Sequence, residues 1–259
     1  MNKLSRKIFI GGNWKCNNTL AETRNLMSNV INKINYDADR MEVLICPSTI
    51  HLAEVANTLE NKAVLIGAQN VSKYDFGAYT GELSCKHLYD YGIKWTLIGH
   101  SERRTLFGED NKLVAEKTMH AIKSKINVVL CIGETLDQRE SNKTLDVIQE
   151  QLNVVINEMK DASHWNNVVI AYEPVWAIGT GKVATPQQAQ DVHKFIREWV
   201  DKNLGSNFSQ SLRIIYGGSV NDKNCNELIK QEDIDGFLIG GASLKGAFKD
   251  IIDIAKEAQ

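Results

Sequence analysis

A glutamate stands at the end of an apolar run near the middle of the chain, in a position where it could act as a base. The run Val168–Ala171 is typical of a buried strand, and Glu173 follows it after a single tyrosine. Pro174 stops the strand and favours an extended backbone at Glu173. Beyond a short loop, Thr185–Pro186 supplies an N-cap and a proline at the first helical position. This pattern predicts a general base beneath a closing loop, although an ordinary loop with an exposed acid has the same pattern.

The glycines of that loop do not form a nucleotide-binding motif. The stretch Gly179–Ala184 matches G-x-G-x-x-A, but five residues separate Glu173 from Gly179, whereas that motif begins directly after its strand. Gly181–Lys182 resembles part of a P-loop, but Val183 stands where a serine or threonine is needed. We therefore expect neither type of nucleotide site here.

Four other segments combine polar residues or glycines with the end of a predicted strand. They are Asn13–Lys15, His100–Arg104, Tyr216–Ser219 and Gly240–Ser243. In a parallel sheet the carboxyl ends of all strands meet at one edge, where ligands bind. The sequence therefore predicts that these residues, although far apart along the chain, converge on one site together with Glu173.

Short apolar runs alternate with amphipathic stretches along the whole chain, which favours parallel strand–helix units. The predicted strands are Ile8–Gly12, Val43–Cys46, Val64–Ala68, Trp95–Gly99, Val128–Ile132, Val168–Ala171, Arg213–Tyr216 and Gly236–Ile239. The predicted helices are Ala21–Asn32, Ile50–Glu60, Lys86–Tyr91, Lys112–Ser124, Leu145–Met159, Pro186–Asn203, Asn224–Lys230 and Phe248–Ala258. Eight such units and no linker predict an α/β fold, a single-domain (β/α)8 barrel over residues 1–259, with an open doubly wound sheet as the alternative.

The amino-acid composition and net charge limit the kinds of protein that this chain can be. The chain has 259 residues, a hydrophobic content of 43% and a net charge of −2, so it can bury a core but has no field that favours nucleic acid or an anionic membrane. No apolar run has the length of a signal peptide or a membrane span. The five cysteines are scattered without C-x-x-C spacing, which predicts reduced thiols in a cytoplasmic protein and neither disulfides nor a metal site.

Several of these segments carry a family resemblance that covers essentially the whole chain. The chain resembles the triosephosphate isomerases in Gly11–Lys15, Ile98–Arg104, Ala171–Gly181 and Tyr216–Val220, in this order. The resemblance implies a homodimeric TIM barrel that interconverts dihydroxyacetone phosphate and glyceraldehyde 3-phosphate without metal or coenzyme. A phosphate-binding barrel without catalysis is the alternative, and it would have no need of the lysine, histidine and glutamate that this chain retains.

The resemblance also implies roles for the polar residues. Glu173 is expected to remove a proton from carbon, and burial would raise its pKa towards the working pH. His100 is expected to move protons between the two substrate oxygens as a neutral imidazole at a helix start. Lys15 would supply positive charge to the enediolate and the phosphate, and Asn13 would orient the substrate oxygen. Glu102 is expected to contact Lys15 or His100. The remaining histidines are expected to be ordinary core residues: His51, His87, His120, His164 and His193.

Phosphate binding is expected from backbone amides, which favours glycine at the points of closest approach. Gly240 and Gly241 precede a short helix start after the last strand, where barrels often bind phosphate. By resemblance, Ser219 and the amide of Gly179 complete this site when the lid closes. Tyr216 and Ser219 would then hold the closed lid by meeting Ala184 and Gly181.

The segment Gln69–Glu82 is a long loop with three aromatic residues and no helix signal, and loops of this length are usually functional. The resemblance implies that it projects into a partner subunit, with Thr80 near its tip close to the partner's Asn13–Lys15. Cys16 would lie in the same interface as a small buried hydrophobe. Cys225, by contrast, is expected to be exposed.

Overall fold

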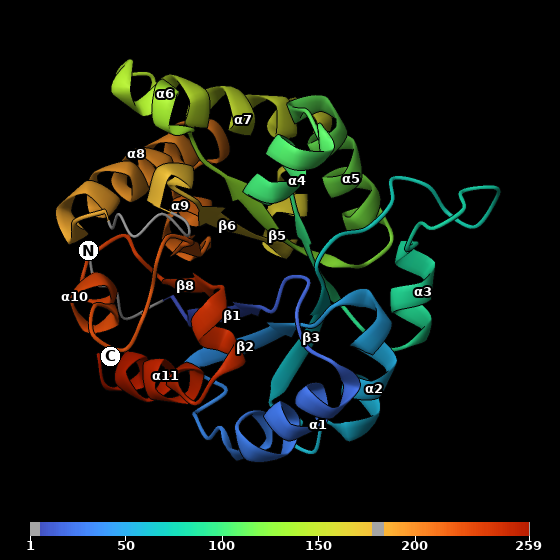
Figure 1. Cartoon of the computed structure of the whole chain (residues 1–259). Coiled ribbons are helices and arrows are strands. Elements are labelled where there is room, and N and C mark those ends of the chain that lie inside the picture. Colours follow the sequence, from blue (N-terminus) through green and yellow to red (C-terminus); the bar gives the residue numbers. More distant parts are fainter. Residues whose placement is uncertain (1–5, 178–183, 259) are drawn as a thin grey trace.

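Eight parallel strands close into a barrel, and each strand pairs with the next one along the chain (Figure 1). The computed structural model describes residues 6–177 and 184–258. The first strand also pairs with the last, with Phe9 opposite Gly236 and Gly12 opposite Ile239, so the predicted barrel is confirmed and the open sheet is excluded. The strands are β1 (Ile8–Asn13), β2 (Met41–Cys46), β3 (Val64–Ala68), β4 (Trp95–Ile98), β5 (Asn127–Ile132), β6 (Val168–Tyr172), β7 (Ile214–Tyr216) and β8 (Gly236–Ile239).

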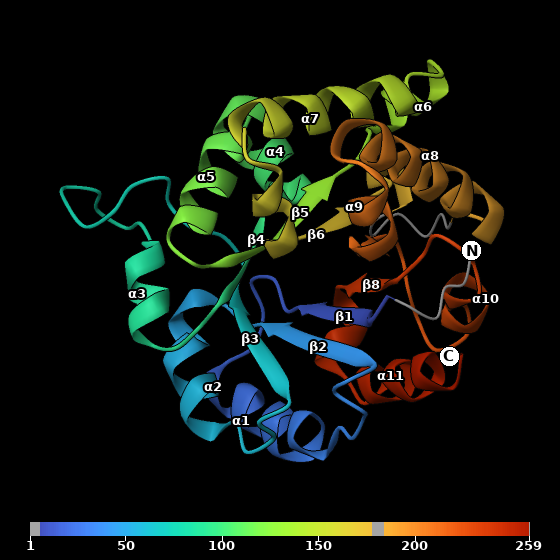
Figure 2. The same cartoon turned by 180° about the vertical axis from the view of Figure 1, so that it is seen from behind.

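Helices surround the barrel on its outside, as the views from both sides show (Figures 1 and 2). The α-helices in the described part of the chain are α1 (Leu20–Asn29), α2 (Leu52–Thr58), α3 (Cys85–Asp90), α4 (Ser101–Phe107), α5 (Asn111–Lys123), α6 (Leu136–Glu140), α7 (Thr144–Glu158), α8 (Pro186–Leu204), α9 (Ser206–Ser211), α10 (Cys225–Ile229) and α11 (Ala247–Glu257). Sequence signals explain several of their starts. Thr185 caps α8 through a capping box with Gln188, and Pro186 occupies the first turn, as predicted.

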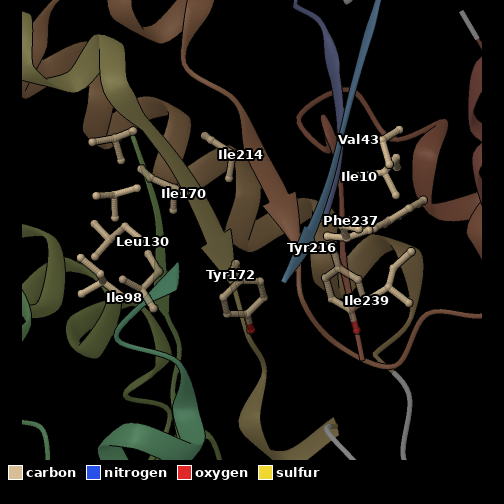
Figure 3. Packing of buried hydrophobic residues seen from close by; sticks show 14 of the residues in the cluster. Ile10, Val43, Ile98, Leu130, Ile170, Tyr172, Ile214, Tyr216, Phe237 and Ile239 are labelled. Atoms are coloured by element: carbon tan, nitrogen blue, oxygen red, sulfur yellow. The ribbon is translucent and has the colours of Figure 1, made fainter. Parts of the chain in front are cut away.

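Alternation along the strands divides the core into two parts. Phe9, Leu97 and Val129 belong to a small cluster that fills the barrel interior. Their neighbours Ile10, Ile98 and Leu130 belong to a larger cluster between the strands and the surrounding helices (Figure 3). Because both faces of the strands are buried, the strand sequences are almost continuously apolar.

The structure differs from the sequence-based elements at a few points. The fourth strand ends at Ile98, because Gly99 adopts a left-handed conformation with φ +77° that no regular strand continues. The helices α6 and α9 were not predicted, since each is short and has no long apolar period. Cys225 is buried, so the expectation that it is exposed is wrong. It lies in the first turn of α10, and it belongs to the cluster between helices and barrel.

One long connection projects from this framework. Residues 69–84 link β3 to α3 without regular secondary structure and extend beyond α3 (Figure 1). Tyr74 and Tyr79 stack within it at a ring-centroid distance of 4.2 Å, so the loop is partly held by its own side chains. Within the described residues, no helix is long and apolar enough to cross a membrane.

Candidate active site

Five strand ends converge on one cavity of about 490 Å³. Asn13 ends β1, His100 and Glu173 follow β4 and β6, and the loops after β7 and β8 supply Ser219 and Gly240. All five residues line the cavity, together with Lys15 and Gly241. The convergence follows from the topology, because parallel strands in a closed barrel place all their carboxyl ends at one rim.

Glu173 and His100 are in direct contact at the centre of this rim. The His100 Nε2 and Glu173 Oε1 atoms lie 3.0 Å apart, and both side chains are buried. The backbone N–H of Ser101 donates to Glu173 Oε2 at 2.9 Å. The carboxylate is therefore held by a hydrogen bond at Oε2 and lies against the histidine ring at Oε1.

The environment of Glu173 shifts its protonation in the direction that a general base needs. Burial raises the pKa of the Glu173 carboxyl, and His100, the Ser101 N–H, Lys15 and Arg104 offset part of this rise. A carboxylate with a raised pKa is a stronger base than an exposed one. It stays ionised when the pH is above that value.

The hydrogen bonds of His100 select one tautomer of the ring. The backbone N–H of Glu102 donates to His100 Nδ1 at 3.2 Å, so Nδ1 acts as an acceptor and the imidazole is neutral. The proton then lies on Nε2, the atom that faces Glu173. This geometry arises because His100 caps the first turn of α4, whose amides point towards the ring.

Lys15 is fixed from several directions. Its backbone is left-handed, with φ +54°, which is uncommon outside glycine, and its N–H donates to Asn13 Oδ1 at 3.0 Å. Its Nζ lies 2.6 Å from Glu102 Oε1. Gln69 donates from Nε2 to the carbonyl oxygens of both Lys15 and Cys46, so it ties this strained turn to β2. The structure thus places Glu102 against Lys15, with its second oxygen 3.6 Å from His100 Nδ1.

Part of the cavity lining is formed by glycines. The 3₁₀ helix Gly241–Leu244 begins directly after Gly240, and the side chain of Lys15 lies against Gly240. A Cβ atom added at Gly240 would lie 3.5 Å from Lys15 Cε, so the lysine already occupies the space next to this glycine. Backbone amides can therefore approach an anion at this wall together with the lysine ammonium.

The start of the loop after β6 is joined to neighbouring strand ends. Ser219 Oγ donates to the carbonyl oxygen of Ala177 at 2.7 Å. Trp176 Nε1 and the Tyr172 hydroxyl both donate to Glu134 Oε1, at 2.9 and 3.1 Å. Gly179 and Gly181, the predicted phosphate ligand and lid contact, lie outside the described residues.

Two glycines make room for Glu173, and the sequence alone does not identify them. A Cβ at Gly217 would lie 2.9 Å from Glu173 Cγ, and a Cβ at Gly133 would overlap the Glu173 carbonyl. The Gly217–Gly218 pair is a partial sequence signal for this close packing, because paired glycines after a strand often mark a place where other atoms approach the backbone closely. Glu134 gave none, since an isolated acid after a strand has many uses.

The model of the triosephosphate isomerase family matches residues 8–256. The chain belongs to the triosephosphate isomerase family. A triosephosphate isomerase of Paracoccidioides lutzii is 50% identical over 250 residues, which are 96% of this chain and 99% of that protein. The cytosolic triosephosphate isomerase of Oryza sativa is 46% identical over 97% of this chain and 98% of its own length. The chloroplastic one of Secale cereale is 47% identical over 93% of this chain and 79% of its own length.

Two residues that are expected at the interface between subunits, Cys16 and Thr80, are exposed in the single chain. Cys16 is the one exposed cysteine, and Thr80 lies in the exposed part of the 69–84 loop. The expectation of ordinary core histidines is correct for His51 and His193 only. His87 is exposed, and His120 and His164 are half-buried.

Proposed function

We propose that this chain interconverts dihydroxyacetone phosphate and D-glyceraldehyde 3-phosphate in the cavity at the barrel rim, with Glu173 as the base. The observation that supports this function is the contact between the Glu173 carboxylate and the neutral His100 imidazole, with Lys15 lining the same cavity. A base, an N–H donor and a cation around one cavity are the groups that proton transfer next to a carbonyl requires.

The reaction then divides between these groups. The Glu173 carboxylate takes a proton from the substrate carbon, and the electron pair of that C–H bond forms the double bond of an enediolate. His100 donates the Nε2 proton to the carbonyl oxygen and recovers a proton from the neighbouring hydroxyl. Glu173 returns its proton to the adjacent carbon. Because the two side chains touch at 3.0 Å, substrate binding has to separate them.

The other residues hold the substrate during these steps. The Lys15 ammonium stabilises the negative charge that develops on the oxygens, and Asn13 orients one of them. Gly240, Gly241, Ser219 and the Gly179 amide bind the phosphate. Glu102 holds Lys15 in place through the contact at 2.6 Å. Closure of the loop after β6 excludes water, which strengthens the electrostatic interactions and protects the enediolate from losing phosphate.

A coupled assay tests this function directly. Conversion of glyceraldehyde 3-phosphate is followed through NADH consumption by glycerol 3-phosphate dehydrogenase, with Glu173→Gln as the matched variant. We expect rapid turnover by the wild type. Binding of a phosphate-bearing substrate by a folded wild type without turnover would contradict the proposal and would favour the alternative of a phosphate-binding barrel without catalysis.

We also propose that the active molecule is a homodimer. The surface next to Lys15 is apolar and open: Ile50, Leu106 and Phe107 are 84%, 74% and 65% exposed. A groove of about 390 Å³ beside them is lined by Lys15, Cys16 and Phe107, among other residues. Insertion of the 69–84 loop of a second copy, with Thr80 near its tip, would cover this groove. It would also complete the site around Asn13 and Lys15.

The oligomeric state of a surface variant tests the dimer. Leu106→Asp is expected to sediment as a monomer with reduced turnover, because a charge cannot be buried unpaired in the interface. Leu145→Asp is the matched control, since Leu145 is also exposed, at 43%, but lies on α7. A wild type that sediments as a monomer at micromolar concentration with full activity would contradict the proposal.

A cytosolic location is the third part of the proposal. All five cysteines are free, and four of them are buried as thiols, which suits a reducing compartment. The relatives include a protein named as cytosolic, but also one named as chloroplastic. Fractionation of source cells with antibody detection tests this location.

A further inference from the structure

Arg104 in α4 has no part in the reaction described above, yet its guanidinium is bound next to the catalytic pair. Its Nε donates to the carbonyl oxygen of Gly99 at 2.7 Å, and its Nη2 donates to the carbonyl oxygen of Cys131 at 3.1 Å. Its Nη1 donates to Asn111 Oδ1 at 2.8 Å. The planar group therefore bridges the ends of two neighbouring strands, β4 and β5.

These two strand ends carry the histidine and support the glutamate. Gly99 directly precedes His100, and its left-handed backbone turns the chain into α4. Cys131 is in register with Ala171 of β6, and the next residue, Ile132, accepts a hydrogen bond at 2.7 Å from the backbone N–H of Glu173. A group that fixes Gly99 relative to Cys131 therefore fixes His100 relative to Glu173.

The fit at this position is close. A Cβ added at Gly99 would lie 2.9 Å from both Arg104 Nη2 and the carbonyl oxygen of Cys131. Lysine cannot replace this arrangement, because its single ammonium lacks the rigid fork that reaches both carbonyls at once. We infer that Arg104 is a positioning residue for the isomerisation, which sets the spacing between His100 and Glu173 and places a fixed positive charge near the base.

The charge of Arg104 is not cancelled by the groups that it binds, because all three acceptors are neutral oxygens. Removal from water lowers the pKa of its guanidinium, so keeping the charge here has a cost. The charged or titratable groups that face Glu173 from the surrounding elements are Lys15, His100, Arg104 and Cys131, with Glu109, Asp110 and Glu150 in the cavity behind it.

That cavity gives a way to test the charge chemically. It has a volume of about 310 Å³, shares Glu173 with the substrate cavity, and is lined by Arg104, Thr105 and Gln138, among other residues. A small guanidinium ion could therefore occupy the space left by a truncated arginine. In the wild type, the guanidinium of Arg104 already binds the three acceptors that this ion would use.

Two variants separate the geometry of Arg104 from its charge. Arg104→Lys keeps the charge and loses the fork, so we expect kcat to fall, by about 10-fold to 10²-fold, with little change in KM. In the plot of kcat/KM against pH, the limb on the acidic side (the low-pH limb) should not shift. Arg104→Ala loses both, so we expect a similar fall in kcat and an upward shift of that limb by about 1 pH unit, because the base loses a neighbouring cation.

Ethylguanidinium at millimolar concentration should restore part of the kcat of Arg104→Ala and return the low-pH limb towards that of the wild type. The neutral ethylurea should do neither. Gln151→Leu is the matched control, because Gln151 ties the next residue, Gly133, through two hydrogen bonds but carries no charge. This variant should not move the low-pH limb, and it should not respond to ethylguanidinium.

The inference rests on the proposed isomerase function, and the wild type separates the two failures. A wild type without isomerase activity would contradict the function. An active wild type whose Arg104→Lys variant has an unchanged kcat would overturn the positioning role. The role would also be overturned if Arg104→Ala lost activity only in proportion to a lower Tm, with no shift of the limb and no response to ethylguanidinium. If Arg104→Ala does not fold, the Arg104→Lys result alone decides.

Discussion

Glu173 and Glu109 line the same cavity of about 310 Å³ and are 2% and 3% exposed, but the pKa values of their carboxyl groups are shifted in opposite directions. Burial raises the pKa of Glu173, whose partners are mainly a neutral imidazole and a backbone amide. The pKa of Glu109 is lowered, because the hydrogen bonds and charges of Lys117 and Arg103 outweigh its burial. The same side chain at the same depth thus has a raised pKa in one place and a lowered pKa in the other, and the surrounding charges decide which.

The two carboxylates also serve different parts of the molecule. Glu173 also lines the cavity of about 490 Å³ at the barrel rim. Glu109 binds Lys117 at 2.6 Å, and Lys117 in turn donates to Asn70 Oδ1 at 3.1 Å, at the base of the 69–84 loop. We therefore expect a substitution of Glu173 to reduce catalytic activity, and a substitution of Glu109 to reduce stability and assembly of the proposed dimer.

Glu173→Gln should have the largest effect on activity. It removes the base but keeps the size of the side chain, so kcat should fall by at least about 10², within the usual range of 10²–10⁴ for a general base, while substrate still binds. Steady-state kinetics and binding of a substrate analogue measure the two effects. Near-normal turnover by this variant would mean that Glu173 is not the base.

Glu109→Gln should have the largest effect on stability. It leaves the buried Lys117 ammonium without the carboxylate that it binds, and breaking a buried ion pair in this way costs about 3 kcal/mol at the low end of the known range. For a domain of this size that corresponds to a fall in Tm on the order of 10 °C. Calorimetry measures it, with the exposed pair variant Glu198→Gln as control, because the Lys194–Glu198 pair is 66% exposed on both sides. An unchanged Tm would mean that the ion pairs of Glu109 do not stabilise the fold.

The exposed thiol of Cys16 reports on assembly and should show a smaller effect. A thiol reagent should inactivate the wild type faster at low protein concentration, because dissociation of the proposed dimer uncovers Cys16 and a bulky adduct prevents reassociation. Glu109→Gln should be inactivated faster still, since its loop is less well supported. Cys16→Ala should be resistant. If wild type and Cys16→Ala lose activity at the same rate, the sensitive group lies elsewhere.

The pH dependence of stability should differ in sign between the two sites, and this is the smallest effect. The folded-state pKa of Glu173 is raised, so its ionisation destabilises the fold, and Glu173→Gln should gain a few degrees in Tm over wild type as the pH rises above about 4.5. The folded-state pKa of Glu109 is lowered, so its contribution is present above about pH 4.5 and is lost as the pH falls through the folded value. If the Tm of both variants, relative to the wild type, changed with pH in the same direction, the two carboxylates would not differ in the way described here.

The sequence predicts the strands, most helices and the rim residues because these depend on local patterns. Apolar runs, the Thr185 cap and polar residues after strands are all visible in the chain order. The contacts of Arg104 and Gln69 were not visible, because each joins strand ends that are distant along the chain. Short helices such as α6 depend on a capping box, here Thr135 with Gln138, more than on periodicity. That signal was available but is weak alone.

The pairing of β1 with β8 has a consequence for the chain during its synthesis. Phe9 finds its partner only when Gly236 has been made, so one edge of β1 stays open while more than 200 residues are added. At about 5–20 residues per second this interval lasts roughly 10–50 s. An open apolar strand edge is a template for aggregation, so the nascent chain is most vulnerable before its last strand emerges from the ribosome. Protection by a chaperone would therefore matter most for chains that are nearly complete.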